Sequence, residues 1–133
     1  MSSESSNVVK QLELVRGKHY QTSTNYQHWD LALDCWGPEY HLGNASKYVC
    51  RWRQKGGIDD LLKAATYLAK CRTHMHKCTH WTDPKLLITH LFTLGLHAHD
   101  HHVVRKIMDA HNEQTLEFAM KALDNLIHAA RSV

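Results

Sequence analysis

The stretch that decides the fold runs from residue 43 to residue 68 and reads GNASKYVCRWRQKGGIDDLLKAATYL. Gly56 and Gly57 interrupt it, and paired glycines favour a turn because they adopt positive φ without steric cost. The pattern on either side predicts one helix over 44–55 and a second over 59–70. Because the link is short, we expect these helices to fold back on one another as an antiparallel hairpin.

The ends and the inner face of this hairpin follow from residue type. We expect the first helix to begin at Asn44, a residue type favoured at the N-cap. Asp59 or Asp60 is expected to cap the second helix and to place negative charge at its positive dipole end. The apolar positions of the second helix recur at helical spacing and should face the core: Leu61, Ala64, Ala65 and Leu68.

One face of the first predicted helix is basic. Its polar residues recur every three or four positions, so they point in roughly one direction: Asn44, Lys47, Arg51 and Lys55. Tyr48 and Trp52 form the neighbouring stripe, and Lys63 joins the cations if the hairpin closes. Because cations bind phosphate and flat rings stack on bases, this face is a candidate nucleotide site. The spacing also fits a solvated basic surface beside aromatic core residues.

Length, composition and charge narrow the class of protein. A chain of 133 residues with 43% hydrophobic content forms one small globular domain. β-branched residues are scattered and do not alternate, so we predict an all-α helical bundle. Residues 44–77 carry eight Lys or Arg against two acids, a local charge of +6 within a chain of net charge +3. This patch would attract an anion, whereas the mild overall charge and the absence of a known recognition motif make nucleic-acid binding an unfavoured function.

The cysteines and apolar runs predict a reduced protein without a membrane span. Four cysteines at 35, 50, 71 and 78 are accompanied by no secretory signal, so we expect free thiols. No apolar run approaches the roughly 18 residues that a membrane-spanning helix needs.

Two clusters of histidine suggest metal ligands. Thiolate and imidazole are the preferred ligands of zinc, and five such residues fall close together: Cys71, His74, His76, Cys78 and His80. Their spacing contains no Cys-x2-Cys pair, so a solvated helix end is the favoured interpretation. The run from His97 to His102 contains one His-Asp dipeptide, which is typical of metal-dependent phosphohydrolases only when further spaced ligands accompany it.

The flanking segments also have helical patterns. The segment from Trp29 to Trp36 is amphipathic and should end at Gly37-Pro38. Asp83-Pro84 predicts the start of an apolar helix, buried on several sides, that continues to about Leu96. The last helix has a stripe that either closes the core or forms a dimer seam, and we expect a homo-oligomer. The stripe consists of Leu116, Ala119, Met120, Leu123, Leu126, Ile127 and Ala130.

The central stretch resembles the SaV-like family of small tailed-phage proteins. The family pattern has His-Tyr, then Gly-Asn-x-x-Lys-Tyr-x-x-Arg, a Lys/Gly turn, and Asp-Leu-x-Lys-Ala-x-x-Tyr-Leu. The resemblance covers residues 17–70, including the connector 29–36. The matching residues are His19, Tyr20, Gly43, Asn44, Lys47, Tyr48, Arg51, Lys55, Gly56, Asp60, Leu61, Lys63, Ala64, Tyr67 and Leu68.

The resemblance implies a phage protein that handles nucleotides in the cytoplasm of the infected bacterial host, since one family member is similar to a nucleotide kinase without a P-loop. It divides the chain into a tail and lead segment (1–16), a SaV-like helical core (17–80) and a C-terminal helical extension (81–133). With the basic face, it makes these residues candidates for ligand or phosphate binding: His19, Tyr20, Asn44, Lys47, Tyr48, Arg51, Lys55 and Lys63. For His19-Tyr20, a tyrosine anchoring the lead segment is an equal alternative.

Two functions would use these same residues. The predicted function is that of a nucleoside monophosphate kinase-like protein without a P-loop, because no Gly-x4-Gly-Lys-Ser/Thr occurs. Its cations would neutralise phosphate charge, and Asp60 is the candidate ligand for magnesium, the one cofactor that a kinase would need. The alternative is a non-catalytic sponge that sequesters a host defence signalling nucleotide. The scarcity of acids in the hairpin suits capture better than chemistry.

Overall fold

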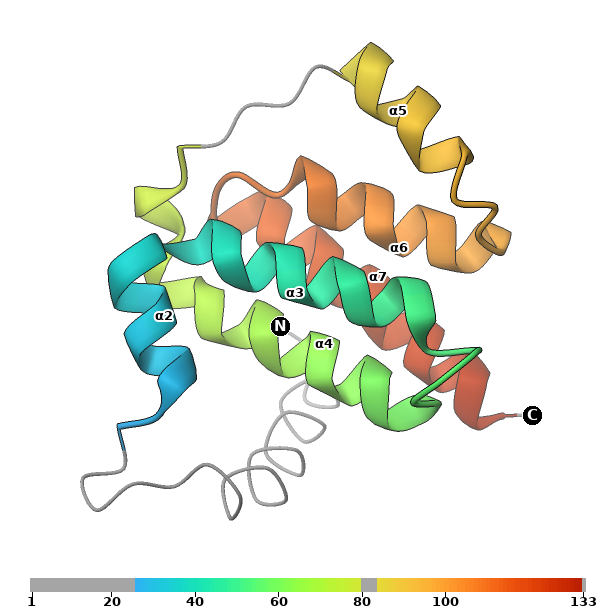
Figure 1. Cartoon of the computed structure of the whole chain (residues 1–133), viewed down its shortest axis with the longest axis horizontal. Coiled ribbons are helices and arrows are strands. Elements are labelled where there is room, and N and C mark those ends of the chain that lie inside the picture. The colour runs from blue at the N-terminus through green and yellow to red at the C-terminus, as the bar shows by residue number, and fades with distance from the viewer. Residues whose placement is uncertain (1–25, 80–83, 133) are drawn as a thin grey trace.

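The computed structural model describes residues 26–79 and 84–132, with side chains from residue 87 onward in the second range. All regular structure in these ranges is helical, which confirms the predicted all-α class (Figure 1). The elements are α2 (His28–Trp36), α3 (Pro38–Arg51), α4 (Ile58–Cys71), the 3₁₀ helix η1 (Arg72–Lys77), α5 (Pro84–Phe92), α6 (Ala98–Asp109) and α7 (Glu113–Arg131).

The predicted antiparallel hairpin is present as α3 and α4, which lie side by side in Figure 1. Residues 52–57 form the turn between them. Gly57 adopts a φ of 61°, and its N–H donates to the carbonyl oxygen of Trp52 at 2.8 Å. A residue with a side chain would be strained at this φ, so the glycine at this position allows the chain to reverse.

The N-terminus of α3 differs from the expected one. The helix begins at Pro38 rather than at Asn44, because proline suits the first helical turn and Gly37 precedes it with a φ of 76°. Gly43 therefore lies inside the helix instead of before it. Burial of Leu42, Ala45 and Val49 holds this part of α3 in the core, which offsets the low helix propensity of glycine. As predicted, α2 ends at Trp36, directly before Gly37-Pro38.

The predicted caps and C-terminus of the hairpin helices also need correction. Residue Gly57 occupies the N-cap of α4, and no side chain caps the helix there. Asp59 and Asp60 instead lie in the first turn, where their charge still favours the helix dipole. Helix α3 ends at Arg51 rather than at Lys55. The turn begins at residue 52, four residues before the paired glycines.

A single core joins the hairpin to the C-terminal helices. Helix α3 packs against α6 and α4 packs against α7, so that two pairs of helices form two layers. The α7 stripe lies in this core and is buried within one copy of the chain, apart from Ala130, which is half-buried. The stripe therefore closes the core rather than forming a dimer seam. The homo-oligomer stays a prediction, and the α7 stripe no longer supports it.

Helix α5 lies at the periphery, set apart from the other helices in Figure 1. It ends at Phe92 rather than near Leu96, and the chain turns through Gly95, which has a φ of 62°. Leu91 is buried, but Phe92 is 67% exposed and Leu94 is also exposed. The expectation that this helix is buried on several sides was therefore wrong.

Two further predictions concern the chain as a whole. All four cysteines are free thiols, as expected. Among the described residues, every helix is too short or too polar to cross a bilayer.

Candidate functional site

Tyr48 on α3 is the centre of the predicted basic face. Lys47 Nζ lies 5.0 Å from the centroid of its ring, and the guanidinium carbon of Arg51 lies 4.9 Å from it. Lys63 approaches the same ring from α4, with Nζ 5.5 Å from the centroid. All three distances are within the range of cation–π attraction. The structure therefore brings together three of the predicted phosphate-binding cations, and the hairpin supplies Lys63 as expected.

Asp60 joins this group from beneath. Its side chain is fully buried, and its two oxygens accept from Arg51 Nε at 2.9 Å and Arg51 Nη2 at 3.3 Å. Lys63 Nζ lies 3.6 Å from the same carboxylate. A bidentate pair of this kind holds the guanidinium in a defined plane. Asp60, the candidate magnesium ligand, is thus engaged in positioning the cations.

Asp60 and Arg51 each stabilise the charged form of the other. Burial raises the pKa of Asp60, but the hydrogen bonds and positive charge of Arg51, with help from Lys63, outweigh burial and hold that pKa below its ordinary value. The hydrogen bond to Asp60 in turn raises the pKa of Arg51. Asp60 is therefore ionised and Arg51 is charged at neutral pH, and the group of three cations and one carboxylate has a net charge of about +2.

The Tyr48 ring has neighbours on the inner side as well. It stacks on Tyr67 of α4 with a centroid distance of 5.8 Å and an interplanar angle of 12°. Tyr67 in turn contacts His41 at 5.1 Å and Trp29 at 6.5 Å, both edge to face. Tyr48 is thus the outer end of an aromatic row between the helices. Because one side of the ring stacks on Tyr67 and three cations contact the ring, Tyr48 holds the cations in place and is not free to stack on a nucleotide base.

His41 is the buried polar member of this row. Its side chain is completely inaccessible on α3. Burial lowers its pKa, and the charge of Lys70 adds to that effect, while the Trp29 backbone and Asp30 oppose it. The imidazole is therefore neutral at neutral pH.

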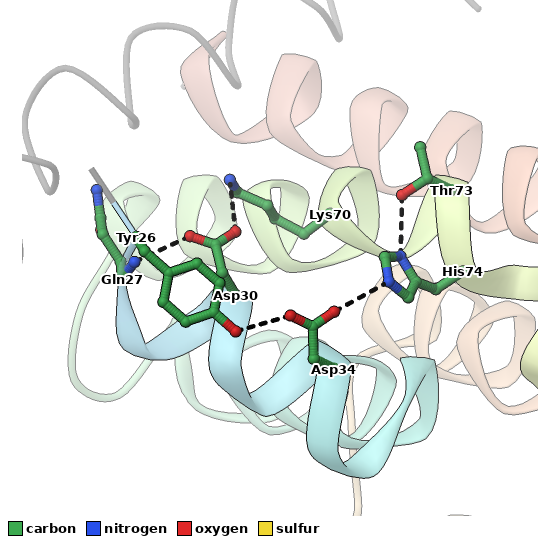
Figure 2. Close-up of polar contacts among 7 residues, drawn as sticks. All are labelled: Tyr26, Gln27, Asp30, Asp34, Lys70, Thr73 and His74. Atoms are coloured by element: carbon green, nitrogen blue, oxygen red, sulfur yellow. Dashed lines mark hydrogen bonds and ion pairs between the residues drawn. The ribbon is translucent and has the colours of Figure 1, made fainter. Parts of the chain in front are cut away.

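Lys70 extends the line of cations along α4, and sequence reasoning missed it. Its Nζ lies 4.7 Å from the Trp29 ring centroid and 3.7 Å from Asp30 Oδ1, a pair visible in Figure 2. The signal was present, because Lys63, Tyr67 and Lys70 recur every three or four residues on one face.

The other predicted site residues do not join the cluster in the same way. Asn44 is half-buried on α3, one turn before Tyr48. Lys55 is exposed in the turn after α3, so it does not continue the helical face on which it was placed. The predictions for His19 and Tyr20 lie outside the described residues.

A second bidentate pair fastens the hairpin turn to α6. Arg53 donates through Nε at 2.7 Å and Nη2 at 3.2 Å to Asp100, which is almost completely buried. The Arg53 guanidinium also covers the Trp52 ring at 4.4 Å. Trp52 is therefore not a free stacking surface, and the Asp of the His-Asp dipeptide has a structural partner.

Figure 2 shows an exposed polar network on the edge formed by α2 and η1. The Tyr26 hydroxyl donates to Asp34 Oδ2 at 2.7 Å, and His74 Nε2 lies 3.5 Å from Asp34 Oδ1. The hydrogen bond to Asp34 raises the pKa of Tyr26 to about 12 and lowers the pKa of Asp34. Thr73 Oγ1 completes the network, 2.9 Å from His74 Nδ1.

The two histidine clusters do not form a metal site within 26–79 and 84–132, where no three His, Cys, Asp or Glu side chains converge. Cys71 is buried, and its Sγ donates to the carbonyl oxygen of Tyr67 at 3.2 Å. Burial raises the pKa of this thiol, so it is not a ready source of thiolate for zinc. His80 of the proposed zinc set lies outside the described residues.

Comparison with known proteins identifies one region of similarity. Residues 15–69 match the model of a family described as a protein of unknown function (DUF3310). This match spans α2, α3 and most of α4, including the Tyr48 cluster. No curated protein and no solved structure matches the chain. The description assigns no activity, so the resemblance to the SaV-like family stays a prediction.

Proposed function

We propose that this chain handles nucleotides by binding a nucleotide phosphate on the α3–α4 hairpin. The observation that carries the proposal is the convergence of Lys47, Arg51 and Lys63 on the Tyr48 ring, at 5.0, 4.9 and 5.5 Å. Three cations held in one place attract a polyanion more strongly than three scattered ones, because their fields add.

Preorganisation supports the proposal. Asp60 fixes two nitrogens of Arg51 and leaves the third to donate to a ligand. The Arg51 side chain is 37% exposed, so it is held from the inside and accessible from the outside. A ligand that binds such a group does not have to order it first, which favours affinity.

Capture without turnover is the function that this geometry favours. A kinase needs carboxylates or substrate phosphates to hold magnesium, and both Asp60 oxygens are bonded to Arg51. A sponge that sequesters a host signalling nucleotide needs only the cations. A P-loop-less nucleoside monophosphate kinase is the second proposal. It rests on the resemblance of the central stretch to the SaV-like family, and its magnesium would be bound mainly through the nucleotide.

One incubation distinguishes the two proposals. The purified chain is mixed with ATP, magnesium and a panel of deoxynucleoside monophosphates and cyclic nucleotides. The flow-through and the heat-released fraction are then analysed by mass spectrometry. A nucleotide that is depleted and recovered unchanged indicates a sponge, whereas new deoxynucleoside diphosphates in excess over protein indicate a kinase.

Substitutions then locate the site. We expect Arg51→Ala and Lys47→Ala each to weaken nucleotide binding at least about tenfold, the loss typical of one charge-assisted hydrogen bond. Lys77→Ala removes an equal charge from η1 and should bind normally. Normal binding by both hairpin variants would show that the nucleotide binds elsewhere.

A further inference from the structure

A second basic surface lies between α6 and α7, apart from the hairpin cations. The two helices pack against each other and leave an open groove of about 290 Å³. Its lining residues are His102, Lys106, Phe118, Lys121, Ala122 and Asn125. This volume is near the lower end for small-molecule sites and fits one ring with one charged group.

Helical spacing explains why these six side chains meet. His102 and Lys106 are four residues apart on α6, so they share one face. The α7 residues occupy positions 118, 121, 122 and 125, which also lie on one face. The α6 face and the α7 face lie next to each other only because the two helices pack together in the folded chain.

The groove is positively charged, and its described lining contains no acid. Lys106 and Lys121 form no ion pair with any residue that the structure describes. Three acids lie within four positions of these lysines: Asp109 pairs with Arg105 at 3.4 Å, Glu117 pairs with Arg72 at 3.3 Å, and Asp124 is buried on α7. The two lysines are therefore available to an external anion, which lysine binds as a point charge.

An exposed ring stands beside these cations. Phe118 is 51% exposed, although α7 is otherwise apolar mainly on its buried face. Ala122 is small and buried, so it lets a flat group approach the helix backbone. Asn125 adds an amide that can donate to a ligand oxygen. The groove thus combines an apolar surface with a concentration of positive charge.

We propose that the α6–α7 groove binds a small phosphate monoester that carries an aromatic ring, with the phosphate at Lys106 and Lys121 and the ring on Phe118. This proposal does not depend on the proposed function, because it involves different helices and different residues from the Tyr48 cluster.

Phenyl phosphate is the probe that tests it. The full chain, labelled with ¹⁵N, is titrated with phenyl phosphate, inorganic phosphate and benzyl alcohol while amide shifts are recorded. We expect saturable shifts at 102–106 and 118–125 with phenyl phosphate, and at least about fivefold weaker binding of the other two compounds, because each supplies only one of the two interactions.

Variants identify the interacting groups. The double change Lys106→Gln and Lys121→Gln should weaken phenyl phosphate binding at least about tenfold, the equivalent of about 1.4 kcal/mol. Phe118→Ala should reduce its affinity to that of inorganic phosphate. These side chains lie on the surface of the groove, so the variants should fold, and their amide spectra check this directly.

Two controls keep the test specific. Lys77→Gln removes one lysine outside the groove and should leave the titration unchanged. Arg51→Ala should leave the α6 and α7 shifts intact, even if it abolishes nucleotide binding at the hairpin. Unchanged affinity in the double lysine variant, or shifts confined to α3 and α4, would overturn the proposal without bearing on the hairpin site.

Discussion

The hairpin face and the α6–α7 groove use the same residue types in different ways. On the hairpin, Lys47, Arg51 and Lys63 surround one tyrosine ring, and a buried carboxylate neutralises part of their charge. In the groove, Lys106 and Lys121 lie near a phenylalanine ring, and no described lining residue is acidic. Basic and aromatic side chains are therefore tied into the fold in the first region and left unpaired in the second.

This difference shows how a charged residue can serve stability or binding. Removing a carboxylate that is buried against an arginine destabilises the protein, because the arginine is left without the partner that compensates its charge. An unpaired lysine at the surface contributes little to stability and can be replaced without cost to the fold. Substitution should therefore reduce stability more in the hairpin than in the groove, and the following predictions test how much buried and exposed polar groups contribute to stability.

The largest effect is expected for Asp60→Ala. Asp60 is fully buried and bonded twice to Arg51, so its loss leaves two cations without their internal partner. Because Arg51 remains partly solvated, we expect a loss of about 1–3 kcal/mol in the free energy of unfolding, measured by urea denaturation. The folded-state pKa of Asp60 is lowered, so its contribution is present at neutral pH and is lost as the pH falls below about 4.

Matched variants make this result interpretable. Asp59→Ala removes an exposed carboxylate from the same turn of α4 and should change the stability little. In Gly56→Ala, the new methyl group would overlap the Asp60 carboxylate and should reproduce part of the Asp60→Ala loss. Gly43→Ala meets open space inside α3 and should stabilise the chain by about 0.5–1 kcal/mol. Equal stability of the Asp59→Ala and Asp60→Ala variants would contradict a structural role for the ion pair between Asp60 and Arg51.

A smaller effect is expected from His41, which lies at the other end of the hairpin's aromatic row. Its folded-state pKa is lowered, so below the unfolded value of about 6.5 the unfolded chain binds a proton that the folded chain excludes. Stability should therefore fall with decreasing pH, by at most about 1.4 kcal/mol per pH unit for this one group.

The measurement is the pH dependence of urea unfolding for the natural chain and for His41→Phe, which retains an aromatic ring against Tyr67. The variant should have a flatter profile between about pH 6.5 and pH 5. His76→Gln, a change at an exposed histidine, should leave the profile as it is. If His41→Phe has an unchanged profile, another histidine is responsible for the acid sensitivity.

The smallest effect is expected at the exposed network of Figure 2, where Asp34 is the solvated counterpart of Asp60. Tyr26 should ionise at a pH of about 12 instead of 10.0, because Asp34 accepts its hydrogen bond. Any stability from this bond is present below pH 10 and is lost as the pH rises toward 12.

Ultraviolet titration of tyrosinate, taken as the difference between the natural chain and Tyr26→Phe, reports this pKa. Asp34→Asn should return the pKa of Tyr26 toward 10.0, while Asp30→Asn should change it little. The urea midpoint of Asp34→Asn should match that of the natural chain, in contrast to Asp60→Ala. A large loss of stability in Asp34→Asn would remove the contrast between exposed and buried carboxylates.

Much of the fold could be predicted from local patterns. Helical periodicity and the paired glycines predict the α3–α4 hairpin, and Gly37-Pro38 predicts the end of α2, because these signals act within a few residues of chain. The spacing of Lys47, Tyr48 and Arg51 places them on adjacent faces of one helix, and the short turn brings Lys63 beside them. This part of the candidate site needed no knowledge of the remaining fold.

Other features required the packed structure. Asp59 and Asp60 are the same residue type at adjacent positions, yet one is exposed and the other is buried against Arg51, because successive residues of α4 point in different directions and only one of these directions faces α3. The N-terminus of α3 depends on burial that offsets an interior glycine.

By itself, then, the sequence determined the all-α class, the hairpin and the face that carries Lys47 and Arg51, since each depends on neighbouring residues. Only the tertiary structure decided which cations are paired and where the α6–α7 groove forms. Charge pairing and grooves depend on distances between side chains from separate helices, and those distances exist only after the core has packed.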